Sequence, residues 1–383
     1  MTHLITGLDT GGAEMMLYKL LAGMNRDQFE NAVISLTTIG PVGEKIQGLG
    51  IPVRALQMRP SLASLGTIGR LRRWLRQDAP DLLQTWMYHA DLVGSLAAGR
   101  IPVIWNVRAS ALSPQDSKHH TRIVQRIAGR FSRHLAQRII FNSHLAQRLH
   151  SQLGYDVGRS VVIPNGFDLD QFQPNPAARQ AIRQTLGISD TQPVIGYVAR
   201  FHPHKDHHNF IQAATQIHQH LPDVQFVLCG KDITPHNPTL MGWIREGGIE
   251  SVTHLLGIRT DIPDLTASFD MGVVASLSEA FPNVIGEAMA CEVPCVVTDV
   301  GDSARIVGEL GRVVPPQSPT ALAEACLEWL QHPPSAEFKH RLRQHILEHY
   351  SLSAIIQQYE ALYRAVAQKK QGGDSPSRSY PNG

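Results

Sequence analysis

Short apolar runs alternate with helix-length amphipathic segments along almost the whole chain, and this alternation constrains its fold most strongly. It is typical of α/β proteins, in which a crossover helix follows each strand of a parallel sheet. The runs fall into two series separated by the stretch Pro174-Asn175-Pro176. In the first series, strands are expected at residues 3–8, 31–36, 53–56, 82–86, 103–107, 139–142 and 161–164. In the second series, strands are expected at residues 194–199, 225–229, 252–256, 271–275, 294–298 and 312–314.

Two such series predict two Rossmann-like, doubly wound domains that face each other across a cleft, with ligands at the carboxyl ends of the strands. A chain of 383 residues with 43% hydrophobic residues also favours two domains over one. We assign residues 1–167 to the first domain and residues 168–350 to the second. Residues 351–368 are expected to form a helix that packs back on the first domain. Residues 369–383, rich in Gly, Ser and Pro, are expected to be a disordered tail.

The overall composition narrows the class of protein. The net charge of +2, from 35 basic and 33 acidic residues, is too small to require a nucleic-acid partner. Four cysteines are too few for a disulfide framework in a chain of this length, and the first residues do not resemble a signal peptide. Apolar stretches also fall short of the roughly 18 residues that span a bilayer. The sequence therefore predicts a cytoplasmic protein.

A glycine pair, Gly11 and Gly12, follows the first expected strand and opens an amphipathic helix. Such a turn presents backbone N–H groups and the positive end of the helix dipole, which favour an anionic or polyhydroxylated ligand. The spacing is not G-x-G-x-x-G, so a dinucleotide fingerprint is not supported. A plain strand-to-helix turn is the alternative interpretation.

The second series opens with V-I-G-Y-V-A-R-F-H-P-H-K-D, which places Arg200 and Lys205 after its first strand. Arginine can bind a phosphate through two N–H groups and lysine adds a compact charge, so the pair could neutralise a pyrophosphate. A solvated basic turn is the alternative. Only Asp206 could complete a metal site with the nearby histidines, so we expect no metal ion. Those histidines are His202, His204, His207 and His208.

The stretch S-E-A-F-P-N-V-I-G-E-A places Glu279 and Glu287 eight positions apart around the start of a helix. Pro282 suits a first helical turn, so free backbone amides are expected at Asn283 and Val284, where they could hold a phosphate. Glu279 could then accept hydrogen bonds from the hydroxyls of a transferred sugar, and Glu287 from a ribose diol. A helix cap and a surface charge are the alternative roles of the two glutamates.

Taken together, these motifs resemble one large family, the retaining GT-B-fold glycosyltransferases. This family is known as glycosyl transferases group 1 and is similar to glycosyltransferase family 4. These enzymes use nucleotide sugars to build bacterial polysaccharides, lipopolysaccharide and other glycoconjugates. The resemblance covers about residues 3–367, and its parts occur in the order of the family. Those parts are G-G-A-E, the Arg200/Lys205 pair, I-P-N-G-F-D-L-D-Q-F-Q-P, L-G-I-R-T-D-I-P and E-A-F-P-N-V-I-G-E-A-M-A-C-E-V-P-C-V-V-T-D-V-G.

The resemblance implies a function for each domain: the first binds the acceptor and the second the nucleotide-sugar donor, most simply a UDP-sugar. It implies catalytic roles for Arg200, Lys205, Glu279 and His89. It places Asn106 and Arg108 beside His89 on the acceptor side. The implied donor-binding residues are Gly11, Gly12, Gly196, Arg200, Lys205, Ile258, Glu279, Ala280, Phe281, Pro282, Asn283, Val284 and Glu287.

The sequence departs from the family at three positions. Ala280 and Glu292 stand where the family usually has glycine, and glycine adopts positive φ more freely than other residues. Ala109 stands where a histidine is common, so His89 becomes the better candidate for orienting donor or acceptor. A histidine that caps the following helix is the alternative role for His89.

A basic stripe runs through the first domain. No acidic residue occurs between Ser117 and Tyr155, and basic residues recur there every three or four positions beside an apolar row. The pattern suits contact with anionic lipid at the inner face of a membrane. A nucleic-acid surface and a merely solvated face stay open, although no aromatic residues interleave with the arginines. The stripe comprises Lys118, Arg122, Arg126, Arg130 and Arg133, beside Ile123, Ile127 and Phe131.

The predicted reaction moves a hexosyl unit from a nucleoside diphosphate sugar to a hydroxyl of a glycan or lipid-linked acceptor, with retention at the anomeric carbon. Basic residues and helix amides would stabilise the departing diphosphate without a cofactor or metal ion. Retaining glycosidases place two carboxylates about 5–5.5 Å apart across the scissile bond, which does not suit this glutamate spacing. Two alternatives stay open: a sugar-nucleotide epimerase or glycosidase on the same frame, and a non-catalytic sugar-nucleotide-binding subunit.

Overall fold

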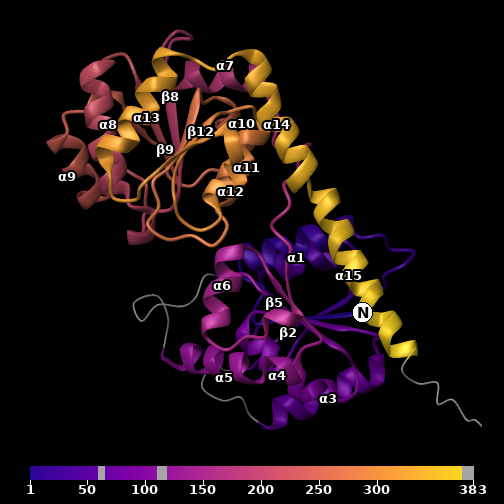
Figure 1. The fold of residues 1–383 in the computed structure, drawn as a ribbon. Helices are drawn as coiled ribbons and strands as arrows, with labels where there is room; N and C mark the ends of the chain where they lie inside the picture. The colour runs from indigo at the N-terminus through magenta and orange to yellow at the C-terminus, as the bar shows by residue number, and fades with distance from the viewer. Residues whose placement is uncertain (59–64, 110–118, 373–383) are drawn as a thin grey trace, which may run out of the picture. The chain divides into compact units, whose positions relative to one another are not determined.

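The computed structural model describes residues 1–58, 65–109 and 119–372 (Figure 1). The chain forms two compact units, one made of Met1–Pro164 with Leu352–Gly383 and the other of Asn165–Ser351. The boundary lies three residues before the expected one, because Phe167 belongs to the second unit. Its amide donates to the Tyr350 carbonyl over 2.8 Å, and its ring stacks on Phe281 at 6.1 Å between centroids.

The first unit contains a seven-stranded sheet in which all neighbouring strands are parallel. Its spatial order is β3 (Val53–Ala55), β2 (Ala32–Ser35), β1 (Thr2–Ile5), β4 (Leu83–Trp86), β5 (Val103–Val107), β6 (Arg138–Phe141) and β7 (Ser160–Val162). The order of strands reverses between β1 and β4. The carboxyl ends of these two strands therefore form the position where doubly wound folds bind ligands.

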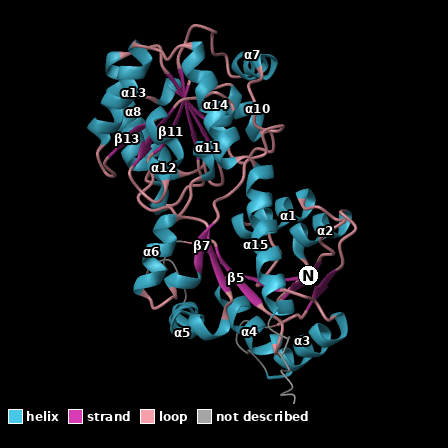
Figure 2. Cartoon of the chain, turned by 45° about the vertical axis from the view of Figure 1, so that its right-hand side comes forward, coloured by secondary structure: helices cyan, strands magenta, loops and turns pink. Residues whose placement is uncertain are grey.

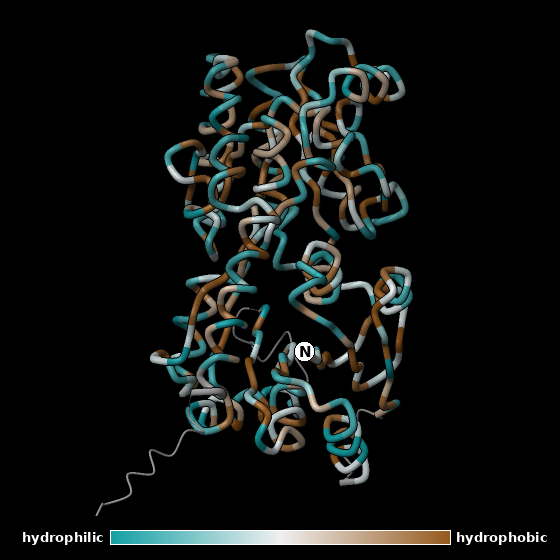
Figure 3. The backbone as a smooth tube through the Cα atoms, turned by 90° about the vertical axis from the view of Figure 1, so that its right-hand side faces the viewer, coloured by the Kyte–Doolittle hydropathy of each residue, from teal (hydrophilic) through white to brown (hydrophobic). Residues whose placement is uncertain are grey.

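Helices cover both faces of this sheet (Figure 2). One layer contains α1 (Gly12–Gly23), α2 (Gly40–Gly48) and the C-terminal α15 (Leu352–Gly372). The other contains α3 (Leu65–Asp78), α4 (Tyr88–Ala98) and α5 (His119–Leu135). The remaining helix, α6 (His144–Gln152), packs on β6 and β7. In Figure 3 hydrophilic and hydrophobic positions alternate along the helices, as expected for elements with one face on a core.

The C-terminal helix completes the core of the first unit. Ile355, Tyr359 and Tyr363 of α15 are almost fully buried in the cluster that also contains the apolar face of α1. The helix extends to Gly372, so the expectation of disorder from residue 369 is wrong for residues 369–372. Their backbone continues the helix without an intervening Pro. The rest of the expected tail, residues 373–383, lies outside the described residues.

The second unit contains a six-stranded parallel sheet. Its spatial order is β10 (Thr253–Leu255), β9 (Gln225–Cys229), β8 (Val194–Val198), β11 (Met271–Val274), β12 (Cys295–Thr298) and β13 (Arg312–Val314). The order reverses between β8 and β11, as it does between β1 and β4. All the strands expected from the sequence are present, with ends that differ by at most a few residues.

Two helix layers also enclose the second sheet. One contains α8 (His207–His220), α9 (Pro238–Glu246) and α13 (Pro319–Gln331). The other contains α7 (Pro176–Thr185), α10 (Ile262–Ala267), α11 (Asn283–Ala290), α12 (Ser303–Val307) and α14 (Ala336–Tyr350). All four cysteines are buried free thiols. Across the described parts of the chain, no helix combines the length and apolar character needed to cross a bilayer.

Candidate functional site

The central strands of the second unit bring Lys205 and Glu279 together. Arg200 follows β8, and Lys205 ends a short 3-10 helix, Pro203–Lys205. Asp206 then turns the chain with a left-handed φ of 48° and caps α8 by accepting from the Asn209 amide over 3.2 Å. Because β8 and β11 are neighbours, these residues lie beside the segment that follows β11. The sequence prediction that this strand edge carries the site is consistent with this arrangement.

Lys205 and Glu279 form a direct ion pair between Nζ and Oε1. Their side chains are 23% and 14% exposed, so the pair is partly shielded from water. A paired lysine is held in one place but is not neutralised permanently, since a competing anion can replace the carboxylate. The pair thus provides both an anion-binding group and an acceptor for hydroxyls at one point.

Three residues that the sequence did not single out hold this pair. The Ser276 hydroxyl donates to Glu279 Oε1 over 2.9 Å, and the Thr298 hydroxyl donates to the Ser276 carbonyl over 2.7 Å. The Tyr197 hydroxyl donates to the backbone carbonyl of Lys205. Burial raises the pKa of Tyr197 well above its usual value, so its hydroxyl stays protonated and can donate. The only local signal for any of them was the position of Ser276 directly after the strand.

The helix α11 begins where the sequence predicted. Pro282 is its N-cap residue, with φ −76° and ψ 102°, and Asn283 is its first residue. The first amides of a helix have no acceptor within the helix, so those of Asn283 and Val284 can bind an anion. The Asn165 amide group donates to Asn283 Oδ1 over 2.6 Å and ties the interdomain segment to this helix start. Phe281 is 8% exposed and serves the core.

Two of the three departures from the family have different structural consequences. Ala280 is not among the described non-glycine residues with positive φ, so alanine costs no backbone strain there. Glu292 does adopt a φ of 62°, where glycine would be less strained, and its side chain accepts a 2.7 Å bond from the His340 ring.

Gly301 has a φ of 63°, and a Cβ there would lie 2.7 Å from the Glu279 carbonyl oxygen. Glycine at 301 therefore supports the loop that carries Glu279.

The outer residues of the predicted donor site lie on neighbouring elements. Glu287 lies just over one turn inside α11 and is half-buried. Ile258 follows Gly257, which has a φ of 63°, and is 74% exposed after β10. An exposed isoleucine at the carboxyl edge of a sheet offers an apolar surface to a flat ring. Beside it, Arg259 and Asp261 pair through two hydrogen bonds, one of 2.8 Å.

Gly196 lies inside β8, where a Cβ would collide with the ring of Phe269. It lines a small hollow together with Val284 and Glu287, two other residues of the predicted donor site. A contact between Gly196 and the donor stays a prediction. The glycine is needed because an aromatic ring packs directly against the strand.

Among the histidines near Lys205, His202 and His204 lie side by side, with 5.0 Å between ring centroids, and the other two pack against aromatic rings. His207 is 2% exposed and packs between Tyr197 and Phe201, at ring distances of 4.9 and 5.4 Å. Burial lowers its pKa to about 4. His208 lies against Trp243 at 4.9 Å. Across residues 1–58, 65–109 and 119–372, no group of three His, Cys, Asp or Glu side chains could hold a metal ion.

In the first unit, the glycine pair and His89 lie at the carboxyl ends of the two central strands. Gly11 is the N-cap of α1 in an extended conformation, and a Cβ on Gly12 would meet open space. A single residue, Met87, connects β4 to α4 with φ 72° and ψ 159°. That conformation is strained for a side chain larger than glycine, and such strain is concentrated at functional sites. It orients His89, which is half-buried in the first turn of α4.

Asn106 and Arg108 have structural partners in the same unit. The Asn106 side chain is fully buried and donates to the Tyr359 hydroxyl over 3.1 Å, so the prediction that it contacts an acceptor is wrong. Arg108 donates to the same hydroxyl over 2.8 Å and lies over the Trp86 ring at 5.7 Å. The C-terminal helix thus fixes the position of Arg108. Ala109 is half-buried beside it.

Comparison with known proteins agrees with this architecture. Residues 10–171 match the family described as Glycosyltransferase Family 4, and residues 192–332 match Glycosyl transferases group 1. The chain therefore belongs to the group 1 glycosyltransferases with the GT-B fold.

Individual relatives support the same assignment. EpsF from Bacillus subtilis (strain 168) is 32% identical over 151 residues, so the alignment spans only 39% of each chain. The UDP-Gal:alpha-D-GlcNAc-diphosphoundecaprenol alpha-1,3-galactosyltransferase of Escherichia coli is 24% identical over 77% of this chain and 81% of its own. The crystal structure of Anabaena Alr3699/HepE in complex with UDP superposes with a TM-score of 0.82 and 26% identity, covering 95% of this chain and 100% of that one. The same protein in complex with UDP-glucose gives a TM-score of 0.79 at 25% identity.

Proposed function

We propose that the protein transfers a hexosyl unit from a UDP-sugar to a hydroxyl of a glycan or lipid-linked acceptor, with retention of anomeric configuration. The reaction would serve the synthesis of cell-surface polysaccharide or another glycoconjugate. The observation that carries this proposal is the Lys205–Glu279 pair, placed where β8 and β11 end at the reversal of the sheet. A cation and a carboxylate at one point match the two parts of a nucleotide sugar, its diphosphate and its hydroxyls.

The donor site follows from the groups around this pair. Arg200, Lys205 and the first amides of α11 would bind the diphosphate, because all three supply N–H groups to phosphate oxygens. Glu279 would accept hydrogen bonds from the sugar, and Glu287 from the ribose diol. Ile258 would contact the base. The relative HepE, which shares 26% identity with this chain, has been crystallised with UDP, and this favours uridine as the base.

The acceptor would bind in the first unit. His89 would orient a hydroxyl from the first turn of α4, and Arg108, held by Tyr359, would bind an anionic part of the acceptor. The Escherichia coli relative is named as a galactosyltransferase for a diphosphoundecaprenol-linked sugar, which carries such a charged group. A phosphate-bearing, lipid-linked acceptor is therefore the form we propose for this chain.

The proposed chemistry occurs on one face of the sugar. The bond between the anomeric carbon and the diphosphate oxygen breaks, and the acceptor oxygen forms its bond to the same carbon from the same side. The leaving phosphate takes the acceptor proton, so no covalent intermediate with the enzyme forms. Charge that develops on the diphosphate is stabilised by Arg200 and Lys205 in a preorganised site. Since these cations supply the positive charge, we propose that transfer does not need a divalent metal ion.

Calorimetric titration of the purified protein with UDP, GDP and ADP in EDTA tests the donor site. We expect UDP to bind, and Arg200→Ala and Glu287→Ala each to weaken binding by about tenfold or more, the loss of one charged hydrogen bond. Arg245→Ala is the matched control, since Arg245 is exposed on α9 in the same unit. Absence of binding by all three nucleotides would contradict the donor site.

Proton NMR of turnover with UDP-sugar and a lipid-linked acceptor tests the reaction. We expect a product whose anomeric configuration matches that of the donor, with unchanged yield in EDTA. An inverted product would exclude the same-face mechanism. An epimerised donor without an acceptor would indicate an epimerase, and donor binding without turnover across acceptors would indicate a binding subunit.

A further inference from the structure

The connection between β4 and α4 is a strained turn, and His89 follows it directly. Met87, the single residue of this connection, has φ 72° and ψ 159°, a conformation that is easy only for glycine. Its amide donates to the Asn106 carbonyl over 3.0 Å, and its carbonyl accepts from the Asp91 amide over 3.0 Å. A strained turn persists only where its surroundings hold it on both sides.

A buried pair of side chains spans this turn. The Thr85 hydroxyl, before Met87, lies 2.6 Å from Asp91 Oδ1, after it, and both side chains are fully buried. The helix can lie this close to the strand because Gly94 has no side chain. A Cβ on Gly94 would lie 2.6 Å from the Thr85 methyl group. The pair therefore joins the end of β4 to the first turns of α4 across the strained residue.

The surroundings of Asp91 favour a neutral carboxylic acid. Burial raises the pKa of Asp91 well above its usual value, and Oδ2 has no hydrogen-bond partner among the described residues. A protonated Asp91 can donate to the Thr85 oxygen, which leaves the Thr85 proton for the Ile104 carbonyl 3.3 Å away. An ionised Asp91 would take that proton and would place a charge in the core. Asparagine is therefore a close substitute for Asp91.

Tyr88 anchors the side of the turn that faces α5. Tyr88 is 1% exposed, and its hydroxyl lies 2.9 Å from His150 Nε2 and accepts from Gln125 over 3.2 Å. Gln125 lies on the buried face of α5, whereas the predicted basic stripe lies on the outer side, where contact with lipid stays a prediction. Of that stripe, Lys118 lies outside the described residues, Arg122 is half-buried, and the exposed members are Arg126, Arg130 and Arg133.

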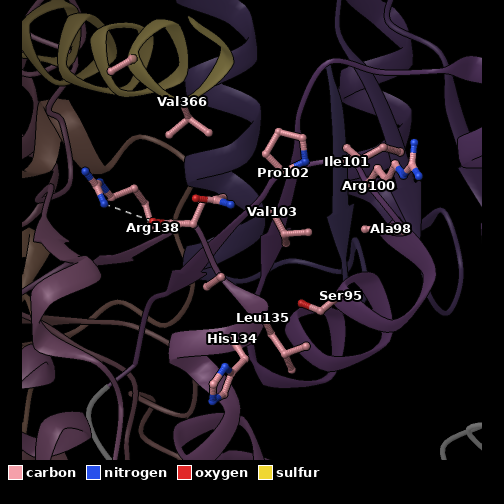
Figure 4. A pocket seen from close by; sticks show the side chains of 14 residues that line it. Ser95, Ala98, Arg100, Ile101, Pro102, Val103, His134, Leu135, Arg138 and Val366 are labelled. Carbon is pink, nitrogen blue, oxygen red and sulfur yellow. Dashed lines mark hydrogen bonds between the residues drawn. The ribbon is translucent and has the colours of Figure 1, made fainter. Parts of the chain in front are cut away.

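Ser95 anchors the next turn of α4. Its hydroxyl donates to the Asp91 carbonyl over 2.7 Å and accepts from the Trp105 indole over 2.9 Å. Figure 4 shows Ser95 on the wall of a cavity near the far end of this helix. Among residues 88–91, only His89 is not buried. The start of α4 is thus fixed on its buried sides, and His89 is the residue of this turn that stays accessible.

We propose that Asp91 is a positioning residue for sugar transfer: together with Thr85 it holds Met87 in the strained conformation that places His89 at the carboxyl end of β4. This inference rests on the proposed function, in which His89 orients the acceptor hydroxyl. Without the pair, Met87 would relax to a negative φ, and the start of α4 would turn and move the imidazole. A misplacement of about 1 Å can slow an enzymatic reaction by about a hundredfold.

The histidine signals in a proton–carbon NMR spectrum report the position of His89 without any turnover. The His89 signal is identified by its absence in His89→Gln. We expect this signal to shift in Asp91→Ala and in Thr85→Val, which removes one hydroxyl at nearly constant shape. It should stay in place in Asp91→Asn, which keeps a neutral group of the same size. The signal of His134, exposed on α5, should stay in place in every variant and shows that the first unit is folded.

Transfer kinetics measure the consequence for catalysis, with the UDP-Gal donor and the alpha-D-GlcNAc-diphosphoundecaprenol acceptor named for the Escherichia coli relative. Asp91→Ala and Thr85→Val should lower kcat/KM by about tenfold to a hundredfold without a change in the Kd of UDP, and Asp91→Asn should keep most of the rate. In a His89→Ala background, Asp91→Ala should cause no further loss, because both changes remove the same contact. The control is Thr215→Val, the same change on α8, where the hydroxyl donates to the Ile211 carbonyl over 3.0 Å.

The outcomes separate this inference from the proposed function. A His89 signal that does not shift in Thr85→Val would overturn the positioning role, and this variant decides the question even if Asp91→Ala fails to fold. A loss of rate that persists in the His89→Ala background would overturn it too, since Asp91 would then serve only to attach α4 to the sheet. An unaltered chain that binds UDP but transfers no sugar would contradict the proposed function and leave the NMR result to decide whether Asp91 places His89.

Discussion

Replacement of Glu279 by glutamine should tighten the binding of UDP and at the same time slow sugar transfer. In the unliganded protein, Glu279 competes with the donor phosphate for Lys205, because the two side chains form an ion pair. Glutamine removes the charge but keeps an oxygen that can accept the 2.9 Å bond from Ser276, so the local structure should persist. UDP contains the diphosphate but no transferred sugar, and thus gains from the free lysine without losing a contact to residue 279.

The burial of the pair sets the expected size of the effect. Side chains that are 23% and 14% exposed lie between a surface pair, worth about 0–1 kcal/mol, and a buried one, for which removal of one partner costs about 3–5 kcal/mol. We expect about 1 kcal/mol, which lowers the Kd of UDP about fivefold. Transfer loses the sugar contact, and we expect kcat/KM to fall about a hundredfold.

Calorimetry with UDP and turnover with the UDP-sugar measure these two changes. Glu328→Gln is the control, since Glu328 accepts a 2.7 Å bond from Arg312 in the same unit but far along the chain from the site. Weaker binding of UDP to Glu279→Gln than to the unaltered protein would refute the reasoning. It would mean that the carboxylate positions Lys205 for the phosphate and does not compete with it.

Three further substitutions test other parts of the structure. Gly301→Ala should lower the free energy of unfolding by about 1–2 kcal/mol and reduce turnover, because φ is 63° and the new Cβ would press on the loop of Glu279. Urea unfolding measures the loss of stability, and kcat/KM measures the loss of turnover. Glu292→Gly should raise the free energy of unfolding by about 0.5–1 kcal/mol, since it relieves a φ of 62°, and unchanged or lower stability would contradict this account. Burial lowers the pKa of His150 to about 4 in the folded protein. As pH falls below about 6.5, this histidine is protonated in the unfolded chain before it is protonated in the folded one, so the free energy of unfolding decreases until pH reaches about 4. In His150→Gln, the free energy of unfolding measured in urea should depend less steeply on pH, by up to about 1.4 kcal/mol per pH unit. This holds provided that glutamine keeps the contact with Tyr88.

The parts of the site that could be predicted from the sequence are those set by local chain geometry. A strand followed by Arg200 and Lys205, and a helix that starts after Pro282, each depend on a few consecutive residues with strong conformational preferences. The two doubly wound sheets follow in the same way, because each apolar run is short and each intervening segment has a helical period.

The parts that could not be predicted depend on neighbours distant in sequence. Gly196 resembles a ligand-binding glycine, but Phe269, more than 70 residues away in the chain, determines why it must be small. Asn106 is polar at the end of a strand and would fit a site, yet Tyr359 from the C-terminal helix binds it inside the core. In the same way, no pattern around Thr298 shows that it positions Ser276 beneath Glu279.

The return of the last helix to the first unit also determines when that unit can fold. A ribosome releases the second unit, Asn165–Ser351, before it releases the residues of α15 that fill the first core. During synthesis, the apolar face of the first unit therefore stays exposed while all residues of the second core are already available. This reverses the usual order, in which the N-terminal domain folds first. Pulse proteolysis of a released chain truncated after Ser351 would show this as a protected second unit and a cleavable first one. The first unit can therefore complete its core only after the residues of α15 have left the ribosome.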